Sequence, residues 1–151
     1  MEDELQQLVE KDRIIDTINQ LFISTDTRDW PTVRACFADT VHFDMTSLAG
    51  GTASHLTPDQ IAATWEEGLQ SLQAIHHQVG NYRVNLESAQ ATAFCYGTAS
   101  HYRPTRSGRN IRVFVGSYDL HLRRVEGRWQ IDSLRFTLKY MDGNAELEKG
   151  E

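Results

Sequence analysis

The sequence predicts an α+β fold: a cone-shaped, curved and mainly antiparallel sheet of about four to six strands, with a long N-terminal helix and two further helices on its concave face. Two observations predict it. The first half has apolar residues at the three-to-four spacing of helices. In residues 75–140, apolar and polar residues alternate with the period of two that is typical of strands. Because these strands follow one another mostly through short turns, we expect them to pair as hairpins.

The composition is that of one globular domain, residues 1–151, with a core spanning about residues 8–140. The net charge of −6 argues against nucleic acid as a partner. No apolar run is long enough to cross a membrane, and the acidic N-terminus does not resemble a signal peptide. Cys36 and Cys95 lack the spacing of metal ligands, which favours reduced core residues in a cytoplasmic protein.

The first helix is predicted over residues 4–26, where Ile15, Ile18 and Phe22 mark an apolar stripe. Asp26 follows Phe22 by four residues and therefore extends the apolar face. A buried carboxylate is costly unless it is paired. Asp26 thus either has a buried partner or begins the next loop as a capping residue.

Shorter elements separate this helix from the sheet. Asp29 is a good N-cap for a short helix that extends through Phe37. Residues 41–46 alternate as a short strand, and residues 47–56 are predicted to be a loop over a cavity mouth. A capping box with proline at the first helical position, Thr57-Pro58-Asp59-Gln60, begins a third helix.

Four long strands are predicted next, at residues 75–86, 91–103, 110–125 and 128–140. The polar and acidic tail from residue 142 is expected to be frayed.

The first long strand begins with His76 and His77. Neighbouring side chains on a strand point to opposite faces, so only one of them can face a pocket. Alternation alone does not say which of the two it is. A carboxylate that bonds one ring nitrogen of the interior histidine would leave the other free to take a proton. Asp26 is the candidate partner.

Further candidates lie on the next two strands. His101 shares a face with small residues that leave room for a cavity, although a strand-end histidine also suits a rim position. Ser117 and Asp119 lie on the polar face of the third long strand, which faces either the pocket or solvent. If it faces the pocket, the apolar residues of the opposite face are expected to be exposed and to form a homo-oligomer interface, namely Tyr118, Leu120 and Leu122.

These residues resemble a known family. The helix end Thr25-Asp26-Thr27-Arg28-Asp29-Trp30, Asp44 on the first strand, and His77-Gln78-Val79-Gly80-Asn81 are similar to the SnoaL-like branch of the nuclear-transport-factor-2-like superfamily. Within it, the pattern is most similar to scytalone dehydratase. The resemblance covers about residues 8–140 and implies a cone-shaped pocket and a homo-oligomer, with a trimer favoured and a dimer as the alternative.

The resemblance also implies roles for individual residues. Asp26 matches the acidic partner of the catalytic histidine, and His77 matches that histidine. His101 matches a second active-site histidine if the hairpin in this chain is one residue shorter than in the family. The pair Ser117 and Asp119 matches a substrate-contacting Ser-x-Asn, and Asp44 is a further expected substrate contact. Two tyrosines of the dehydratase are absent, because Thr25 and Met45 stand in their places.

The expected activity is elimination, because an Asp–His pair at these places also resembles the dehydrochlorinase of the superfamily. We expect a dehydratase-like lyase that acts on a small cyclic or polyketide-like substrate. The alternatives are a SnoaL-like isomerase or cyclase and a small-molecule-binding module without catalysis. No phosphate-binding glycine loop is present, and His42 with Asp44 is too small a set of ligands, so we expect no cofactor and no metal.

Overall fold

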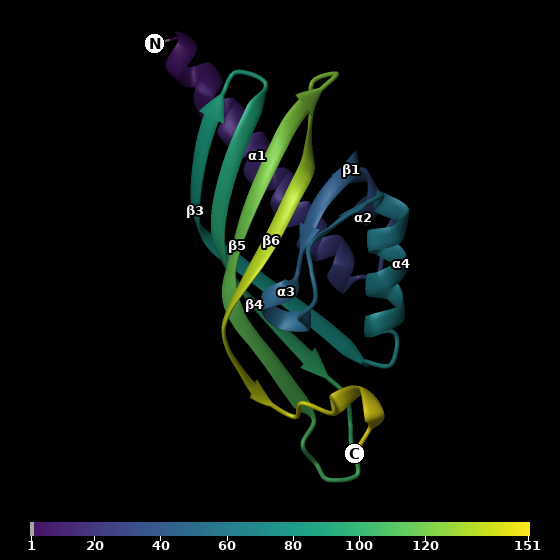
Figure 1. Cartoon of the computed structure of the whole chain (residues 1–151). Coiled ribbons are helices and arrows are strands. Elements are labelled where there is room, and N and C mark those ends of the chain that lie inside the picture. The colour runs from purple at the N-terminus through teal and green to yellow at the C-terminus, as the bar shows by residue number, and fades with distance from the viewer. Residues whose placement is uncertain (1) are drawn as a thin grey trace.

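The structure is a computed structural model that describes residues 2–151, and it has the predicted architecture (Figure 1). Helix α1 (Glu2–Asp26) lies along one side of a six-stranded sheet with the order β2-β1-β6-β5-β4-β3. All neighbouring strands are antiparallel except β1 and β6, which run parallel. The predicted curved, mainly antiparallel sheet with a long N-terminal helix is confirmed. The sheet does not close into a barrel.

The four long strands lie close to their predicted ranges, at β3 (Ala74–Glu87), β4 (Gln90–Tyr102), β5 (Ile111–Val125) and β6 (Arg128–Gly143). Two shorter strands complete the sheet beside β6, namely β1 (Phe37–Asp44) and β2 (Ser54–Leu56). Strand β2 lies within the segment that was predicted to be a loop.

Three short helices surround one end of the sheet. Asp29 caps α2 (Trp30–Ala35) by accepting a hydrogen bond from the backbone N–H of Thr32. The predicted capping box begins α4 (Pro58–Leu69). Helix α3 (Thr46–Ala49) is a single turn between β1 and β2. None of the helices in residues 2–151 is both long and apolar enough to cross a membrane.

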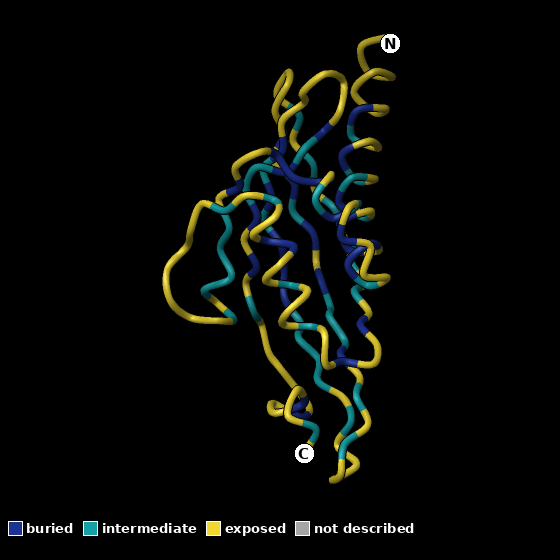
Figure 2. Tube along the Cα trace, turned by 90° about the vertical axis from the view of Figure 1, so that its right-hand side faces the viewer, coloured by how far each residue is buried: buried dark blue, intermediate teal, exposed yellow. Residues whose placement is uncertain are grey.

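The core lies between α1 and the concave face of the sheet, where Ile14, Ile18 and Phe22 are buried (Figure 2). Strand β5 contributes Leu120 and Leu122 to this core, with 3% and 0% of their surfaces exposed. Each such side chain contributes about 1.5–3 kcal/mol when it is buried. The expectation that these two leucines form an exposed interface is therefore wrong.

The register between β4 and β5 explains the correction. Cys95 lies directly opposite Tyr118, and residues that face each other across an antiparallel pair point to the same side of the sheet. Cys95 is fully buried, so Tyr118 is on the concave side as well, and only 6% of its surface is exposed. Ser117 and Asp119 consequently point to the convex side.

The acidic tail is packed against the domain, whereas we expected it to be frayed. A short 3₁₀ helix, η1 (Leu147–Lys149), places Leu147 in a fully buried position beside Leu72 and Ile75. Burial of this apolar side chain favours docking of the tail. Arg112 of β5 also binds the tail, through Glu148.

Candidate active site

A cavity of about 420 Å³ lies on the concave side of the sheet, next to helices α3 and α4. Its wall is largely apolar, and its polar members include His77, His101 and Arg112. The aromatic members are Phe22, Phe43, Trp65, Phe114, Tyr118 and Phe136. A pocket with an apolar wall and a few convergent polar groups is the usual form of a small-molecule site.

Asp26 and His77 meet beside this cavity. Asp26 is the last residue of α1, and its Oδ1 lies 2.6 Å from Nδ1 of His77. Its Oδ2 accepts a hydrogen bond from the backbone N–H of His77 at 2.7 Å. Phe22 lies one helical turn earlier, and its ring centroid is 5.2 Å from that of His77. Asp26 therefore has the partner that a carboxylate on an apolar helix face requires.

The contact with Asp26 assigns the proton of the His77 ring. An ionised carboxylate can only accept hydrogen bonds, so Nδ1 of His77 donates and Nε2 carries the free lone pair. Nε2 makes no hydrogen bond to any residue of the described chain, 2–151, and the ring forms part of the cavity wall. His77 can therefore accept a proton in the cavity, and Asp26 would stabilise the resulting imidazolium.

His101 carries its proton on the other nitrogen. Its Nδ1 lies 3.2 Å from Nη2 of Arg112, the residue directly opposite on β5. A guanidinium can only donate, so Nδ1 accepts and the proton lies on Nε2. Burial, the charge of Arg112 and the nearby His77 lower the pKa of His101 to about 4. His101 is thus neutral near pH 7 and can donate a hydrogen bond through Nε2.

The tail holds Arg112 in this position. Nη1 of Arg112 lies 2.5 Å from Oε2 of Glu148 and 3.3 Å from the carbonyl oxygen of Ala145. Arg112 was not among the residues predicted for the site. Its place opposite His101 would have identified it, had the register of the β4–β5 hairpin been known.

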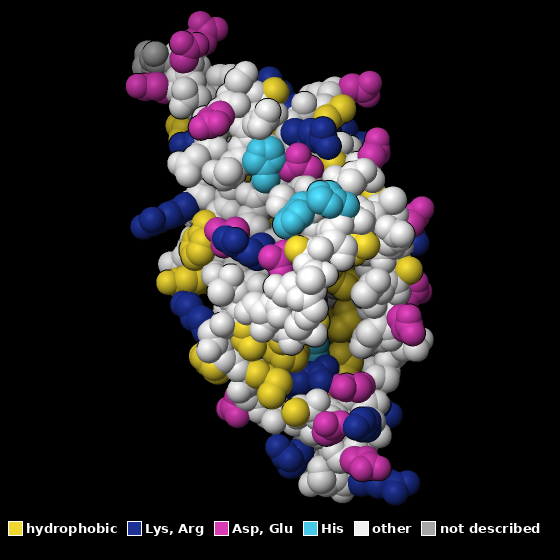
Figure 3. Space-filling view, in the orientation of Figure 1, with side chains coloured by type: hydrophobic (Ala, Val, Ile, Leu, Met, Phe, Trp, Pro, Cys, Tyr) yellow, Lys and Arg dark blue, Asp and Glu magenta, His cyan; other side chains and the backbone are white. Residues whose placement is uncertain are grey.

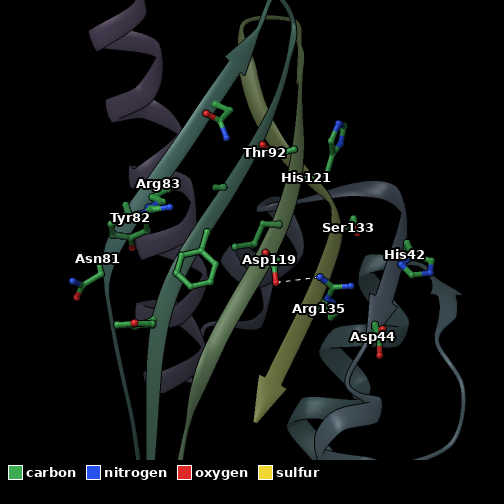
Figure 4. A pocket seen from close by; sticks show the side chains of 15 residues that line it. His42, Asp44, Asn81, Tyr82, Arg83, Thr92, Asp119, His121, Ser133 and Arg135 are labelled. Atoms are coloured by element: carbon green, nitrogen blue, oxygen red, sulfur yellow. Dashed lines mark hydrogen bonds and ion pairs between the residues drawn. The ribbon is translucent and has the colours of Figure 1, made fainter. Parts of the chain in front are cut away.

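Ser117, Asp119 and Asp44 do not line this cavity, contrary to the expectation. All three lie on strand positions that point to the convex face. Asp119 pairs at 3.3 Å with Arg135, which lies directly opposite on β6, and both line a groove of about 950 Å³ that Asp44 also lines (Figure 4). Asp44 accepts hydrogen bonds from the backbone and hydroxyl of Thr46, which begins α3.

The convex face carries a second histidine–aspartate pair. Nδ1 of His121 lies 2.5 Å from Oδ1 of Asp132, and its Nε2 lies 3.2 Å from Oε1 of Gln90. Figure 3 shows histidine side chains among acidic and basic ones on this face. No group of three or more His, Cys, Asp or Glu side chains in residues 2–151 is arranged to hold a metal ion.

Comparison with known proteins identifies the family. The profile of the SnoaL-like domain matches residues 6–135. The chain belongs to the SnoaL-like family. No match was found among curated proteins.

Solved structures share the fold of this SnoaL-like protein. Kfla4162 from Kribbella flavida is 22% identical with a TM-score of 0.89, covering 95% of this chain and 99% of its own. A candidate scytalone dehydratase from Novosphingobium aromaticivorans is 17% identical with a TM-score of 0.81, covering 95% and 92%. A type 2 hexachlorocyclohexane dehydrochlorinase (LinA) is 14% identical with a TM-score of 0.79, covering 94% and 93%. At these identities the similarity establishes the fold alone.

Proposed function

We propose that this SnoaL-like protein is a dehydratase-like lyase that eliminates water, or a similar leaving group, from a small cyclic or polyketide-like substrate. The observation that carries the proposal is that the Nδ1 atoms of two histidines at one cavity have opposite partners, a carboxylate for His77 and a guanidinium for His101. Nε2 of His77 is a free acceptor, whereas Nε2 of His101 is a donor. Elimination needs a base at one atom and a hydrogen-bond donor at the leaving group.

The proposed reaction keeps its protons in balance. His77 takes a proton from the carbon next to a carbonyl group, and the electron pair of that C–H bond forms the new double bond. The carbon–oxygen bond of the leaving hydroxyl breaks as His101 donates a hydrogen bond to the departing oxygen. The imidazolium of His77 then returns its proton to that oxygen, so water leaves and the enzyme is regenerated. Asp26 orients His77 and stabilises its charged form.

The cavity wall favours a neutral substrate that contains a ring. Six aromatic side chains surround the space, and the charge of Arg112 is already paired with Glu148. Thr25 and Met45 lie in the same wall, at the places where the similar dehydratase has tyrosines. We therefore expect a substrate smaller than scytalone or one held differently.

The test is a screen of cyclic hydroxy-ketones and polyketide-like compounds, with loss of water followed by mass spectrometry. Turnover that disappears in both His77→Ala and Asp26→Asn supports the proposal. A product of unchanged mass would identify an isomerase or cyclase instead. Tight binding without any conversion would identify a small-molecule-binding module.

We also propose that the protein forms a homo-oligomer, with a trimer favoured, although the residues first expected at its interface are buried. The convex face still exposes apolar side chains, since Tyr96 and Tyr140 have 46% and 57% of their surfaces accessible. Contiguous exposed apolar surface usually marks an interface. Light scattering at micromolar concentration tests this, and a monomeric mass would contradict it.

A further inference from the structure

The hydroxyl group of Tyr118 is a polar group in the cavity that the reaction above does not use. Tyr118 lies on β5 and forms part of the same cavity wall as His77 and His101. Among residues 2–151, its hydroxyl has no hydrogen-bond partner. The hydroxyl oxygen nevertheless keeps some accessible surface. A largely buried hydroxyl normally has a partner, so this one is free for a ligand.

The backbone directs the Tyr118 ring toward the histidines. Tyr118 lies opposite Cys95, but its ring covers Gly97, two residues further along β4. A Cβ atom at Gly97 would lie only 2.3 Å from Cε2 of the ring. The next residue on this face of β4 is Ala99, which lies directly opposite His77 on β3. The ring therefore leans along the sheet from the core toward the cavity.

Two aromatic side chains fix the ring in this orientation. The centroid of Phe22 lies 4.8 Å from that of Tyr118, and the centroid of Phe136 lies 4.9 Å away. Phe22 also contacts the ring of His77. Because the ring is already held in place, its hydroxyl loses little conformational entropy when it binds a ligand.

The hydroxyl is protonated at any working pH. Burial raises the pKa of Tyr118 well above its usual value, and the nearby Cys95 and Asp26 act in the same direction. Tyr118 is thus a hydrogen-bond donor.

We propose that the Tyr118 hydroxyl donates a hydrogen bond to the substrate carbonyl oxygen whose neighbouring carbon loses its proton to His77. This inference rests on the proposed elimination. Removing that proton shifts negative charge onto the carbonyl oxygen, and a fixed donor there stabilises the enolate-like transition state. Tyr118 keeps its proton throughout. His77 thus removes the proton from carbon, His101 donates a hydrogen bond to the leaving oxygen, and Tyr118 donates one to the carbonyl oxygen.

The first test is Tyr118→Phe, which keeps the ring over Gly97 and between its aromatic neighbours. We expect kcat to fall on the order of 100-fold with KM little changed, because the hydrogen bond strengthens mainly in the transition state. The matched control is Tyr96→Phe on the convex face, which should keep wild-type kcat. A wild-type kcat for Tyr118→Phe would overturn the inference while leaving the elimination intact.

A binding measurement keeps the inference testable even if no compound is turned over. The 4-nitrophenolate anion at pH 8 presents an oxyanion on a ring, whereas nitrobenzene has the ring without it. We expect Tyr118→Phe to bind the phenolate about tenfold more weakly than wild type and nitrobenzene equally well. Equal phenolate affinity in both proteins would overturn the inference, whatever becomes of the proposed reaction.

Discussion

Two histidine–aspartate pairs lie on opposite faces of one sheet and have nearly the same length. Nδ1 of His77 is 2.6 Å from Asp26 on the concave face, and Nδ1 of His121 is 2.5 Å from Asp132 on the convex face. Their surroundings differ. His77 presents a free Nε2 beside an aromatic cavity, whereas Nε2 of His121 contacts Gln90. The His121 side chain is also more exposed, at 33% against 13%.

A contact between a carboxylate and an imidazole does not by itself define a catalytic site. What separates the two pairs is the second ring nitrogen and the wall that it faces. Within residues 2–151, both carboxylate oxygens of Asp26 bond to His77 and to no other residue, whereas Asp132 also pairs with Arg123 at 3.5 Å. The proposed proton transfer is therefore assigned to the pair of Asp26 and His77, whereas His121 and Asp132 belong to an ion network at the surface.

The largest expected effect is on turnover of a hydroxy-ketone substrate. His77→Ala and Asp26→Asn should each lower kcat by about two to four orders of magnitude, because they remove the base or the charge that stabilises its protonated form. The matched changes on the outer pair, His121→Ala and Asp132→Asn, should leave kcat unchanged. Steady-state kinetics of the four variants measure this difference. Equal losses of kcat in both pairs would show that the two pairs do not differ in function.

A smaller loss is expected at the donor. His101→Leu should lower kcat on the order of 100-fold, because the departing oxygen loses its hydrogen bond. His101→Gln should recover part of the activity, since its side-chain amide can still donate a hydrogen bond. If Leu and Gln variants were equally active, His101 would not act as a donor.

Acid should destabilise the fold through His101, the buried histidine of the cavity wall. The pKa of His101 is near 4 when folded, below its usual value near 6.5, so the unfolded chain binds the extra proton first as pH falls. Above pH 6.5, His101 is neutral in both states and does not lower the free energy of unfolding. Below that pH the free energy of unfolding decreases, until the folded protein also takes up the proton near pH 4. Between pH 6.5 and 5 this amounts to about 2 kcal/mol.

Urea denaturation of wild type and His101→Gln at pH 6.5 and at pH 5 measures this effect. The free energy of unfolding of His101→Gln should depend less on pH than that of wild type. An unchanged pH dependence in His101→Gln would show that His101 does not titrate in this way.

The smallest expected effect concerns the tail. Glu148→Ala should lower kcat several-fold, because Arg112 loses the partner that holds it against His101, while the half-exposed carboxylate contributes about 1 kcal/mol or less to stability. Lys149→Ala on the same segment is the control. Kinetics together with thermal denaturation separate this effect from unfolding of the tail.

Local rules identified Asp26 and His77 as candidates, and the family resemblance chose between the alternatives that those rules left open. The helical stripe placed Asp26 on the buried face, and strand alternation separated His77 from His76, which is exposed. Capping rules located the beginnings of α2 and α4.

The face of β5 could not be derived in the same way. It depends on the register across the loop at residues 103–110, and an antiparallel register shifted by one residue would have placed Ser117 or Asp119 opposite Cys95. Alternation gives two sets of side chains but does not say which set faces the core. The docking of the tail was missed because its only apolar anchor, Leu147, is a single residue in an acidic segment.

The close approach of Tyr118 to Gly97 also constrains how this sequence can vary. A Cβ atom at position 97 would lie 2.3 Å from the ring of Tyr118, and the rings of Phe22 and Phe136 pack against that ring and limit its movement. Positions 97 and 118 are therefore coupled, although they lie on different strands. Among related sequences with this fold, an aromatic residue at position 118 should occur with glycine at 97, and a bulkier residue at 97 should occur with a small one at 118.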